Sequence, residues 1–253
     1  MDDEIFTPRA GHSATAVTLP NGTPALVAFG GYDGESVCDD SHVFVPAEGT
    51  WRPLGAEGEP PAPRAMHAAA LLDGDMLVVH GGWAGDDVLR SDTCVLELLP
   101  GEQPFWDSPC SRLSIAPGPS ARQGHTLVAV APREVLLFGG DVGGDVSAEL
   151  WSLSAPRDET DELRWQSIAP SGAPPPARSG HVACALPQPA DATGGLMLIF
   201  GGRVADGACL GDLFLFATDT CAWSQPRTPC CRSRASSRAT STLISECGLQ
   251  EYV

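Results

Sequence analysis

The chain contains no lysine: all 15 of its basic residues are arginine, against 32 acidic residues, and its formal net charge is −17. Such an acidic surface repels phosphates, which excludes sequence-independent binding to nucleic acids. A P-loop phosphate site is also excluded, because its motif requires a lysine. The G-x-S-x-G nucleophile elbow of many hydrolases does not occur either. We therefore expect neither a nucleic-acid partner nor these two kinds of catalysis.

Long apolar segments and paired metal-binding cysteines are missing as well. No run of about 18 apolar residues occurs, so we expect no membrane-spanning helix and no membrane partner. The first residues lack the basic and apolar regions of a secretion signal, which favours the cytoplasm, with the nucleus as the alternative. The nine cysteines include no C-x-x-C pair, so we expect reduced thiols rather than a zinc site. Cys94, Cys184 and Cys221 lie in apolar stretches and are expected in the core.

Glycine and proline, by contrast, are abundant, with 28 and 23 residues. Both interrupt helices, so the composition excludes a helical bundle, while 43% hydrophobic residues exclude a wholly disordered chain. Eight of the glycines form four pairs, each of which ends an apolar run. We expect these pairs to allow a tight bend and a close approach of two backbones. The pairs are Gly30 and Gly31, Gly81 and Gly82, Gly139 and Gly140, and Gly201 and Gly202.

The glycine pairs belong to a sequence unit that occurs four times. Each unit begins with an Arg-x-x-His motif, continues through the apolar run, the glycine pair, an acidic loop and a second apolar stretch, and ends with a tryptophan. The units span about residues 7–55, 60–112, 118–170 and 174–226. The motif residues are Arg9 and His12, Arg64 and His67, Arg122 and His125, and Arg178 and His181; the tryptophans are Trp51, Trp106, Trp165 and Trp223.

Each unit contains four short stretches typical of β-strands. Asn21 and Gly22 join the first two strands of unit one, and Asp73 and Gly74 those of unit two, which is a strong hairpin pattern. Four antiparallel strands repeated with Gly-rich turns are typical of a β-propeller blade. The sequence therefore predicts an all-β propeller with four four-stranded blades.

This order of motifs resembles the kelch family over residues 7–226. The resemblance implies a kelch-type β-propeller. Units two and three are most similar to the kelch half of plant F-box light receptors of the zeitlupe type, but the 253 residues contain neither an F-box nor a light-sensing domain, so neither activity is carried over. Kelch propellers usually close with more than four blades. Three alternatives stay open: an incomplete ring, an unusual closure with four blades, or a shortened gene product.

The segments on either side of the repeats depart from the pattern. Residues 1–6 form an N-terminal tail. Residues 227–253 hold four of the arginines and two of the acidic residues, so their formal charge is +2, against −19 for residues 1–226. We interpret residues 227–253 as a Ser/Arg-rich tail that is disordered or arises from altered splicing or a shifted reading frame. The alternative is a basic tail that is phosphorylated or binds an acidic surface.

Strand direction predicts which residues share a face. The loop between strands two and three of each blade and the link to the next blade open on the same side, because consecutive strands run in opposite directions. Arginine offers bidentate recognition of carboxylates, and large aromatic residues on loops are typical binding hot spots. The alternatives are that the arginines lock neighbouring blades and that the aromatics pack over them. The candidate partner-binding residues are Arg9, Tyr32, Arg64, Trp83, Arg122, Asp141, Arg178 and Arg203.

The remaining repeated residues are expected to be structural. The motif histidines lie tens of residues apart, which does not favour one shared metal, and the terminal tryptophans are expected to anchor blade packing. One metal pattern remains: Glu35, Asp39 and His42 resemble the iron-binding residues of plant kelch specifier proteins, with one residue fewer between Asp and His. Copper radical oxidases with a kelch-like propeller need tyrosine ligands, and the two tyrosines here exclude that reading.

We therefore expect a non-enzymatic protein–protein interaction module without catalytic residues, metal or cofactor. Its partner is expected to be another protein, recruited as by a scaffold or adaptor in a ubiquitin-ligase-like assembly, with self-association through open blade edges as a further expectation. The alternatives are an iron-dependent lyase of the specifier type and a truncated kelch product without stable function.

Overall fold

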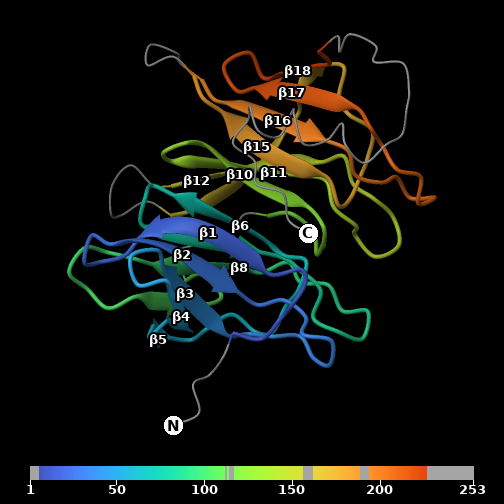
Figure 1. Cartoon of the computed structure of the whole chain (residues 1–253). Coiled ribbons are helices and arrows are strands. Elements are labelled where there is room, and N and C mark those ends of the chain that lie inside the picture. Colours follow the sequence, from blue (N-terminus) through green and yellow to red (C-terminus); the bar gives the residue numbers. More distant parts are fainter. Residues whose placement is uncertain (1–5, 112, 114–116, 156–161, 189–193, 227–253) are drawn as a thin grey trace.

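A computed structural model of the chain describes residues 6–111, 113, 117–155, 162–188 and 194–226. Its regular structure consists of β-strands arranged in four sheets (Figure 1). Blade one contains β1 (Ser13–Thr18), β2 (Pro24–Phe29), β3 (Ser41–Val45) and β4 (Thr50–Pro53). Blade two contains β5 (Glu57–Gly58), β6 (Ala68–Leu72), β7 (Met76–His80), β8 (Thr93–Glu97) and β9 (Phe105–Asp107). Blade three contains β10 (Thr126–Ala131), β11 (Glu134–Phe138), β12 (Leu150–Ser154) and β13 (Arg164–Ile168). Blade four contains β14 (Ser171–Gly172), β15 (Val182–Leu186), β16 (Leu196–Phe200), β17 (Leu213–Ala217) and β18 (Ala222–Ser224).

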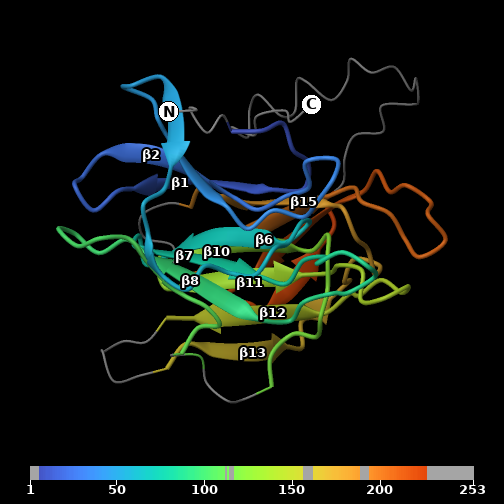
Figure 2. The same cartoon turned by 90° about the horizontal axis from the view of Figure 1, so that it is seen from below.

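The four sheets are the blades of a β-propeller, which confirms the predicted fold class. In each blade four strands pair antiparallel in chain order, and the first of them is innermost: β6 contacts β1 on one side and β10 on the other, and β10 also contacts β15. Figure 2 shows β6 and β10 near the centre and β13 at the outer edge. No helix among the described residues is long and apolar enough to cross a membrane.

Two short strands were not expected from the sequence. β5 pairs parallel with β9 at the outer edge of blade two, and β14 pairs in the same way with β18 of blade four. Each is only two residues long and ends in glycine, so neither shows the alternation of apolar and polar residues by which a strand is recognised. The expected hairpins do form: Asp73 and Gly74 both adopt positive φ between β6 and β7.

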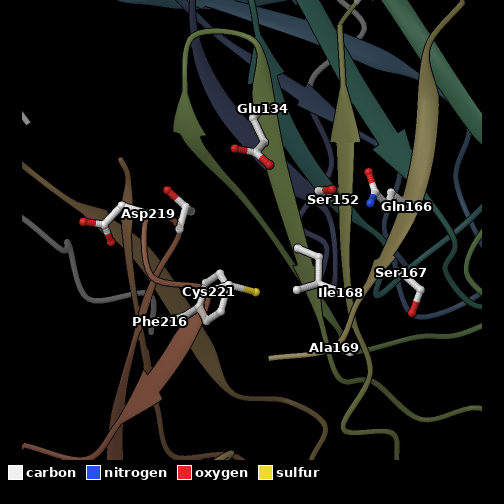
Figure 3. A pocket seen from close by; sticks show the side chains of 10 residues that line it. Glu134, Ser152, Gln166, Ser167, Ile168, Ala169, Phe216, Asp219 and Cys221 are labelled. Atoms are coloured by element: carbon white, nitrogen blue, oxygen red, sulfur yellow. The ribbon is translucent and has the colours of Figure 1, made fainter. Parts of the chain in front are cut away.

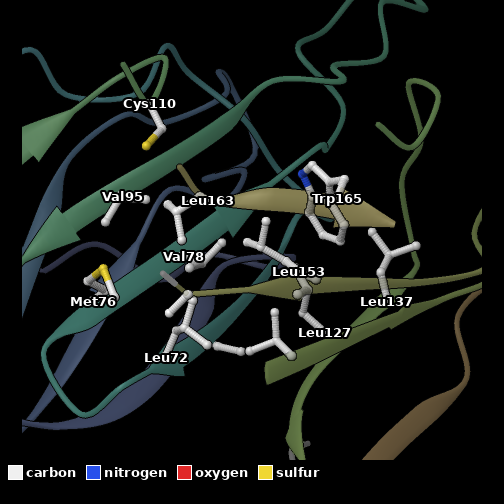
Figure 4. Packing of buried hydrophobic residues seen from close by; sticks show 14 residues of the cluster. Leu72, Met76, Val78, Val95, Cys110, Leu127, Leu137, Leu153, Leu163 and Trp165 are labelled. Carbon is white, nitrogen blue, oxygen red and sulfur yellow. The ribbon is translucent and has the colours of Figure 1, made fainter. Parts of the chain in front are cut away.

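The core consists of apolar layers between successive blades. Figure 4 shows the layer between blades two and three, where Leu72, Val78 and Val95 of blade two meet Leu127 and Leu153 of blade three. Equivalent layers lie between blades one and two and between blades three and four. Successive residues of a strand face different neighbouring blades, because each inner blade packs one face of its sheet against the preceding blade and the other against the following blade.

The terminal tryptophans connect these layers. Trp106, Trp165 and Trp223 are buried and pack against the residue that precedes the glycine pair in the preceding blade. The ring centroids of these pairs lie 5.3, 5.1 and 5.3 Å apart. Trp51 differs, because it is 37% exposed and stacks on Phe6 at 4.6 Å instead.

The domain boundaries predicted above stay predictions, and the interpretation of residues 227–253 lies outside the described residues.

The six cysteines that the structure describes form no disulfide with one another. Cys94 is buried, and Cys184 and Cys221 are partly buried. Burial raises the pKa of the Cys94 thiol to about 11, so this group stays protonated at neutral pH. A buried, protonated thiol acts as a small apolar side chain.

Candidate partner-binding face

Each motif arginine is held by the same two groups of its own blade. Arg64 donates to the carbonyl of Gly81 at 3.0 Å and to the carboxylate of Asp92 at 2.7 Å, and its side chain is fully buried. Burial alone would raise the pKa of Asp92, but the hydrogen bond and the charge of Arg64 outweigh it and lower that pKa. The equivalent pairs are Arg9 with Gly30 and Asp40, Arg122 with Gly139 and Glu149, and Arg178 with Gly201 and Asp212.

These contacts correct the expectation that the motif arginines line a partner pocket. The side chains of Arg64, Arg122 and Arg178 are fully buried, and that of Arg9 is only 3% exposed. Hydrogen bonds within the chain engage all the N–H donors of the Arg64 guanidinium, so this side chain has none left for a partner. The arginines therefore join the glycine loop to the start of the third strand, and we leave them out of the partner-binding surface.

The residues that follow the glycine pairs lie where the strand directions predicted. Each forms an isolated β-bridge with the residue after the motif arginine, so the two loops open on one face of the propeller. The bridges join Tyr32 to Ala10, Trp83 to Ala65, Asp141 to Gln123, and Arg203 to Ser179. One position in the fold thus carries four different side chains, two of them aromatic.

The two aromatic residues contact each other across blades one and two. The rings of Tyr32 and Trp83 lie 5.9 Å apart, edge to face. Tyr32 is 36% exposed, and its hydroxyl donates to the carbonyl of Gly34 at 2.9 Å. The rings therefore pack on the neighbouring blade and still reach solvent, and their role in binding a partner stays a prediction.

Met66 is a feature of this face that the sequence reasoning missed. It occupies the position of Gly11, Gly124 and Gly180 in the other units, and it is 48% exposed. Its φ is +55°, a left-handed conformation that costs a side chain about 1–2 kcal/mol. Backbone strain of this kind gathers at functional sites. The sequence did contain the pattern, since only unit two replaces this glycine.

Further exposed apolar residues extend the surface. Val88 lies in the loop between β7 and β8, and Val142 in the loop between β11 and β12. Acidic residues lie in the loops that follow the glycine pairs, among them Asp33, Asp86, Asp87 and Asp145. We call the apolar set the loop face: Tyr32, Met66, Trp83, Val88 and Val142.

The motif histidines lie between blades. The Nε2 atom of His67 is 2.9 Å from the hydroxyl of Ser13 in blade one, and that of His181 is 2.9 Å from the hydroxyl of Thr126 in blade three. Burial lowers the pKa of His67 to about 3 and that of His181 to about 4, with the nearby arginines adding to the effect. These histidines are therefore neutral at physiological pH and connect adjacent blades.

The iron-binding pattern is not assembled. His42 is buried on β3, and its Nδ1 atom lies 3.3 Å from the carboxylate of Asp40. The described part of the chain contains no group of three His, Cys, Asp or Glu side chains placed to hold a metal ion, so Glu35, Asp39 and His42 do not form one.

A cavity of about 470 Å³ (Figure 3) is lined by Glu134 at the start of β11, so it lies at the opposite end of the blades from the loop face. Glu134 and Gln166 of blade three face Asp219 and Cys221 of blade four across it. Burial raises the pKa of Glu134. The lining contains two acidic side chains and no basic one.

Comparison with known proteins agrees with this architecture. Two overlapping segments, residues 1–140 and 124–248, match the model of the KLHDC2/KLHL20/DRC7 Kelch-repeats domain. Adagio-like protein 3 of Oryza sativa subsp. japonica is 36% identical over 75% of this chain and 29% of its own length. Adagio protein 3 of Arabidopsis thaliana is 33% identical over 75% of the chain and 30% of its own length. Serine/threonine-protein phosphatase BSL2 of the same plant is 29% identical over 76% of the chain.

The match covers only a part of each relative. The chain spans less than a third of the length of both Adagio proteins and 18% of the phosphatase. On the family match, the identity to the relatives and the four blades, this chain belongs to the kelch-repeat family.

Proposed function

We propose that the chain is a protein-interaction module that binds its partner through the loop face. The observation that carries the proposal is the placement of Tyr32, Trp83 and the strained Met66 on one face of a rigid scaffold. Kelch-family membership supports a non-enzymatic role, and variable loops on a fixed framework are a common way to build a binding surface. Exposed apolar side chains within a polar rim are typical of protein–protein sites.

The chemistry of the face favours a particular kind of partner segment. The apolar residues would hold an apolar anchor, and the acidic loop residues would attract basic groups beside it. The net charge of −17 would steer such a basic partner over longer distances. We therefore propose a partner segment with one or two large apolar side chains flanked by arginine or lysine.

The finer role that we propose is recruitment of a substrate to a ubiquitin-ligase-like assembly in the cytoplasm or nucleus. Its support is the similarity to Adagio proteins, which matches the resemblance to F-box kelch proteins found in the motifs. The chain would then supply recognition, and another component would supply the catalytic chemistry.

A capture experiment with matched variants tests the proposal. The tagged chain, its Trp83→Ala variant and its Phe105→Ala variant are used to capture cell proteins, which are identified by mass spectrometry. Phe105 is exposed at the outer edge of blade two and serves as the control. We expect a partner that the wild type and Phe105→Ala retain and Trp83→Ala loses, with weakening of about 2 kcal/mol, or about 30-fold in Kd. Equal capture by all three would contradict the proposal, provided that their melting curves agree.

A further inference from the structure

The contact between successive blades is built in the same way three times. The second glycine of each pair donates its N–H to the carbonyl of the motif arginine in the next blade. That arginine donates its own backbone N–H to a loop carbonyl of the preceding blade. The first bonds run from Gly31 to Arg64, Gly82 to Arg122 and Gly140 to Arg178, at 2.9, 2.8 and 2.9 Å; the second run from Arg64 to Cys38, Arg122 to Arg90 and Arg178 to Ser147, at 3.0, 3.1 and 3.1 Å.

The fourth contact, from blade four to blade one, is not made in this way. Gly202 and Arg9 are both described, and no backbone hydrogen bond joins them. A Cβ atom on Gly139 would lie 2.6 Å from the carbonyl of Arg178, whereas one on Gly201 would meet only the carbonyl of Leu210, at 3.5 Å and in its own blade. Among the described residues, blade four therefore makes only one of its two possible blade contacts, the one with blade three.

The unused half is an apolar sheet face. Phe200 is 40% exposed, whereas Phe29 and Phe138 at the same position of blades one and three are 1% and 0% exposed. Val182 on the neighbouring strand is also exposed. The opposite face of the same sheet is covered by blade three, since Met197 and Ile199 are fully buried.

Blade one keeps the complementary half. Its outer side carries Trp51, the residue that the other blades pack against their predecessor, and Ala16 is exposed on β1. Phe6 stacks on Trp51 at 4.6 Å. Phe6 packs on Trp51 at the position where Phe29 packs on Trp106 and Phe138 packs on Trp223. The N-terminal segment thus covers a ring that a preceding blade would otherwise cover.

We propose that blade four binds blade one of a second copy of this chain. Phe200 of each copy replaces Phe6 on Trp51 of the other, and Gly202 donates to the carbonyl of Arg9 across the contact. Two reciprocal contacts join two chains into one closed ring of eight blades, which lies within the range known for propellers. The contact is of the kind that already joins blades one to four, so it needs no new chemistry.

The charge of Arg203 favours blade one of the second copy, rather than blade four of that copy, as the partner of blade four. In the internal contacts the residues after the glycine pairs lie close together: Tyr32 contacts Trp83, and the charge of Arg203 helps to lower the pKa of Asp141. The ring contact would place Arg203 beside Tyr32 and Asp33 of the other copy. An arginine then meets an aromatic ring and a carboxylate, both of which attract it. Blade four against blade four would bring two Arg203 side chains together.

Sedimentation velocity over a concentration series tests the proposal. The set comprises the wild type, Phe6→Ala, Phe200→Asp on blade four, Ala16→Asp on blade one, and the control Val88→Asp on the loop face. We expect wild type and control to dimerise, Phe6→Ala to dimerise at lower concentration, and the two blade variants to be monomers. A mixture of Phe200→Asp with Ala16→Asp should form a heterodimer that is weaker than the wild-type dimer, because one of its two contacts joins an unaltered blade four to an unaltered blade one and the other carries both substitutions.

Three results would overturn the proposal. The first is a monomer at every concentration for both wild type and Phe6→Ala. The second is dimerisation of Ala16→Asp alone, which would indicate that two copies of blade four meet. The third is failure of the mixed variants to associate. If Phe200→Asp does not fold, Val182→Asp takes its place, because Val182 is more than half exposed and tolerates a charge. The readout is independent of partner binding, so it does not depend on the proposed function.

Discussion

Phe138 in blade three and Phe200 in blade four precede the same glycine pair in the same motif, yet the first is fully buried and the second is 40% exposed. The sequence around them, LLFGG and LIFGG, does not distinguish them. What differs is the neighbour, because blade three has a following blade and blade four does not contact one in the same way. In a repeat protein, the contribution of a residue to stability therefore depends on whether its blade has a neighbour on that side as much as on its motif.

Truncation of the two phenylalanines should show the largest difference. Phe138→Ala removes a ring that packs on Trp223 and His181 and leaves a cavity between blades, so we expect a loss of about 3–5 kcal/mol of unfolding free energy. In the monomer, Phe200→Ala removes a ring that is already partly in water, and its loss should be about 1–2 kcal/mol. Urea denaturation of both variants, at a protein concentration too low for two chains to associate, measures this difference. Equal losses under that condition would contradict the comparison.

Alanine at the first glycine of the pair gives a second contrast. Gly139 and Gly201 have φ of +68° and +69°, so backbone strain of about 1–2 kcal/mol is common to both variants. Only Gly139→Ala also forces a Cβ atom against the carbonyl of Arg178, which should add about 1–3 kcal/mol. The difference in urea midpoint between the two variants, measured where the chain is monomeric, is the test. A larger loss for Gly201→Ala would contradict the comparison.

Acid should weaken the internal blade contacts through their histidines. Burial holds the pKa of His67 at about 3 and lowers that of His125 well below its ordinary value. An unfolded chain protonates these groups near pH 6.5, so between about pH 6.5 and 4 the unfolded state binds more protons and stability falls as pH falls. Each histidine contributes up to about 1.4 kcal/mol per pH unit.

Removal of one histidine checks that origin. His67→Gln should unfold with a shallower dependence on pH over this window, because one proton fewer is taken up on unfolding. Urea denaturation of both proteins at several pH values gives the slopes. If the slopes agree, the acid sensitivity comes from other groups.

The smallest effect on stability is expected at Met66. Met66→Gly relieves a left-handed backbone at about 1–2 kcal/mol, but glycine gains about 0.5–1 kcal/mol of freedom in the unfolded chain, so the net change should stay within about 1 kcal/mol. The same variant should weaken partner binding measurably, because an exposed anchor is lost. A thermal melt and a binding titration with the captured partner separate the two. Unchanged binding would remove Met66 from the loop face.

Much of this fold follows from local patterns in the sequence. The spacing of the motifs places all sixteen main strands, since each glycine pair marks the end of a second strand and each tryptophan marks the fourth. The burial of Arg64 could not be predicted in this way. The spacing of a motif gives the position of an arginine along the chain, but not whether its side chain points into the blade or toward solvent. The exposure of Phe200 depends on a neighbour, which no local pattern encodes. The difference at Met66 could have been predicted by comparing the four units at this position, because the other three have glycine there.

The hydrogen bonds around Met66 have a consequence for how the loop face binds. Met66 donates to the carbonyl of Gly11, Gly124 to that of Met66, and Gly180 to that of Gly124, at 2.7, 2.9 and 2.8 Å. These three bonds connect the corresponding loops of all four blades, each loop to the next, as hydrogen bonds connect neighbouring strands of a sheet. The amide protons of these loop residues should therefore exchange with solvent as slowly as those of a sheet. Loops that are already ordered lose little entropy when a partner arrives, so the surface is prepared for binding before the partner meets it.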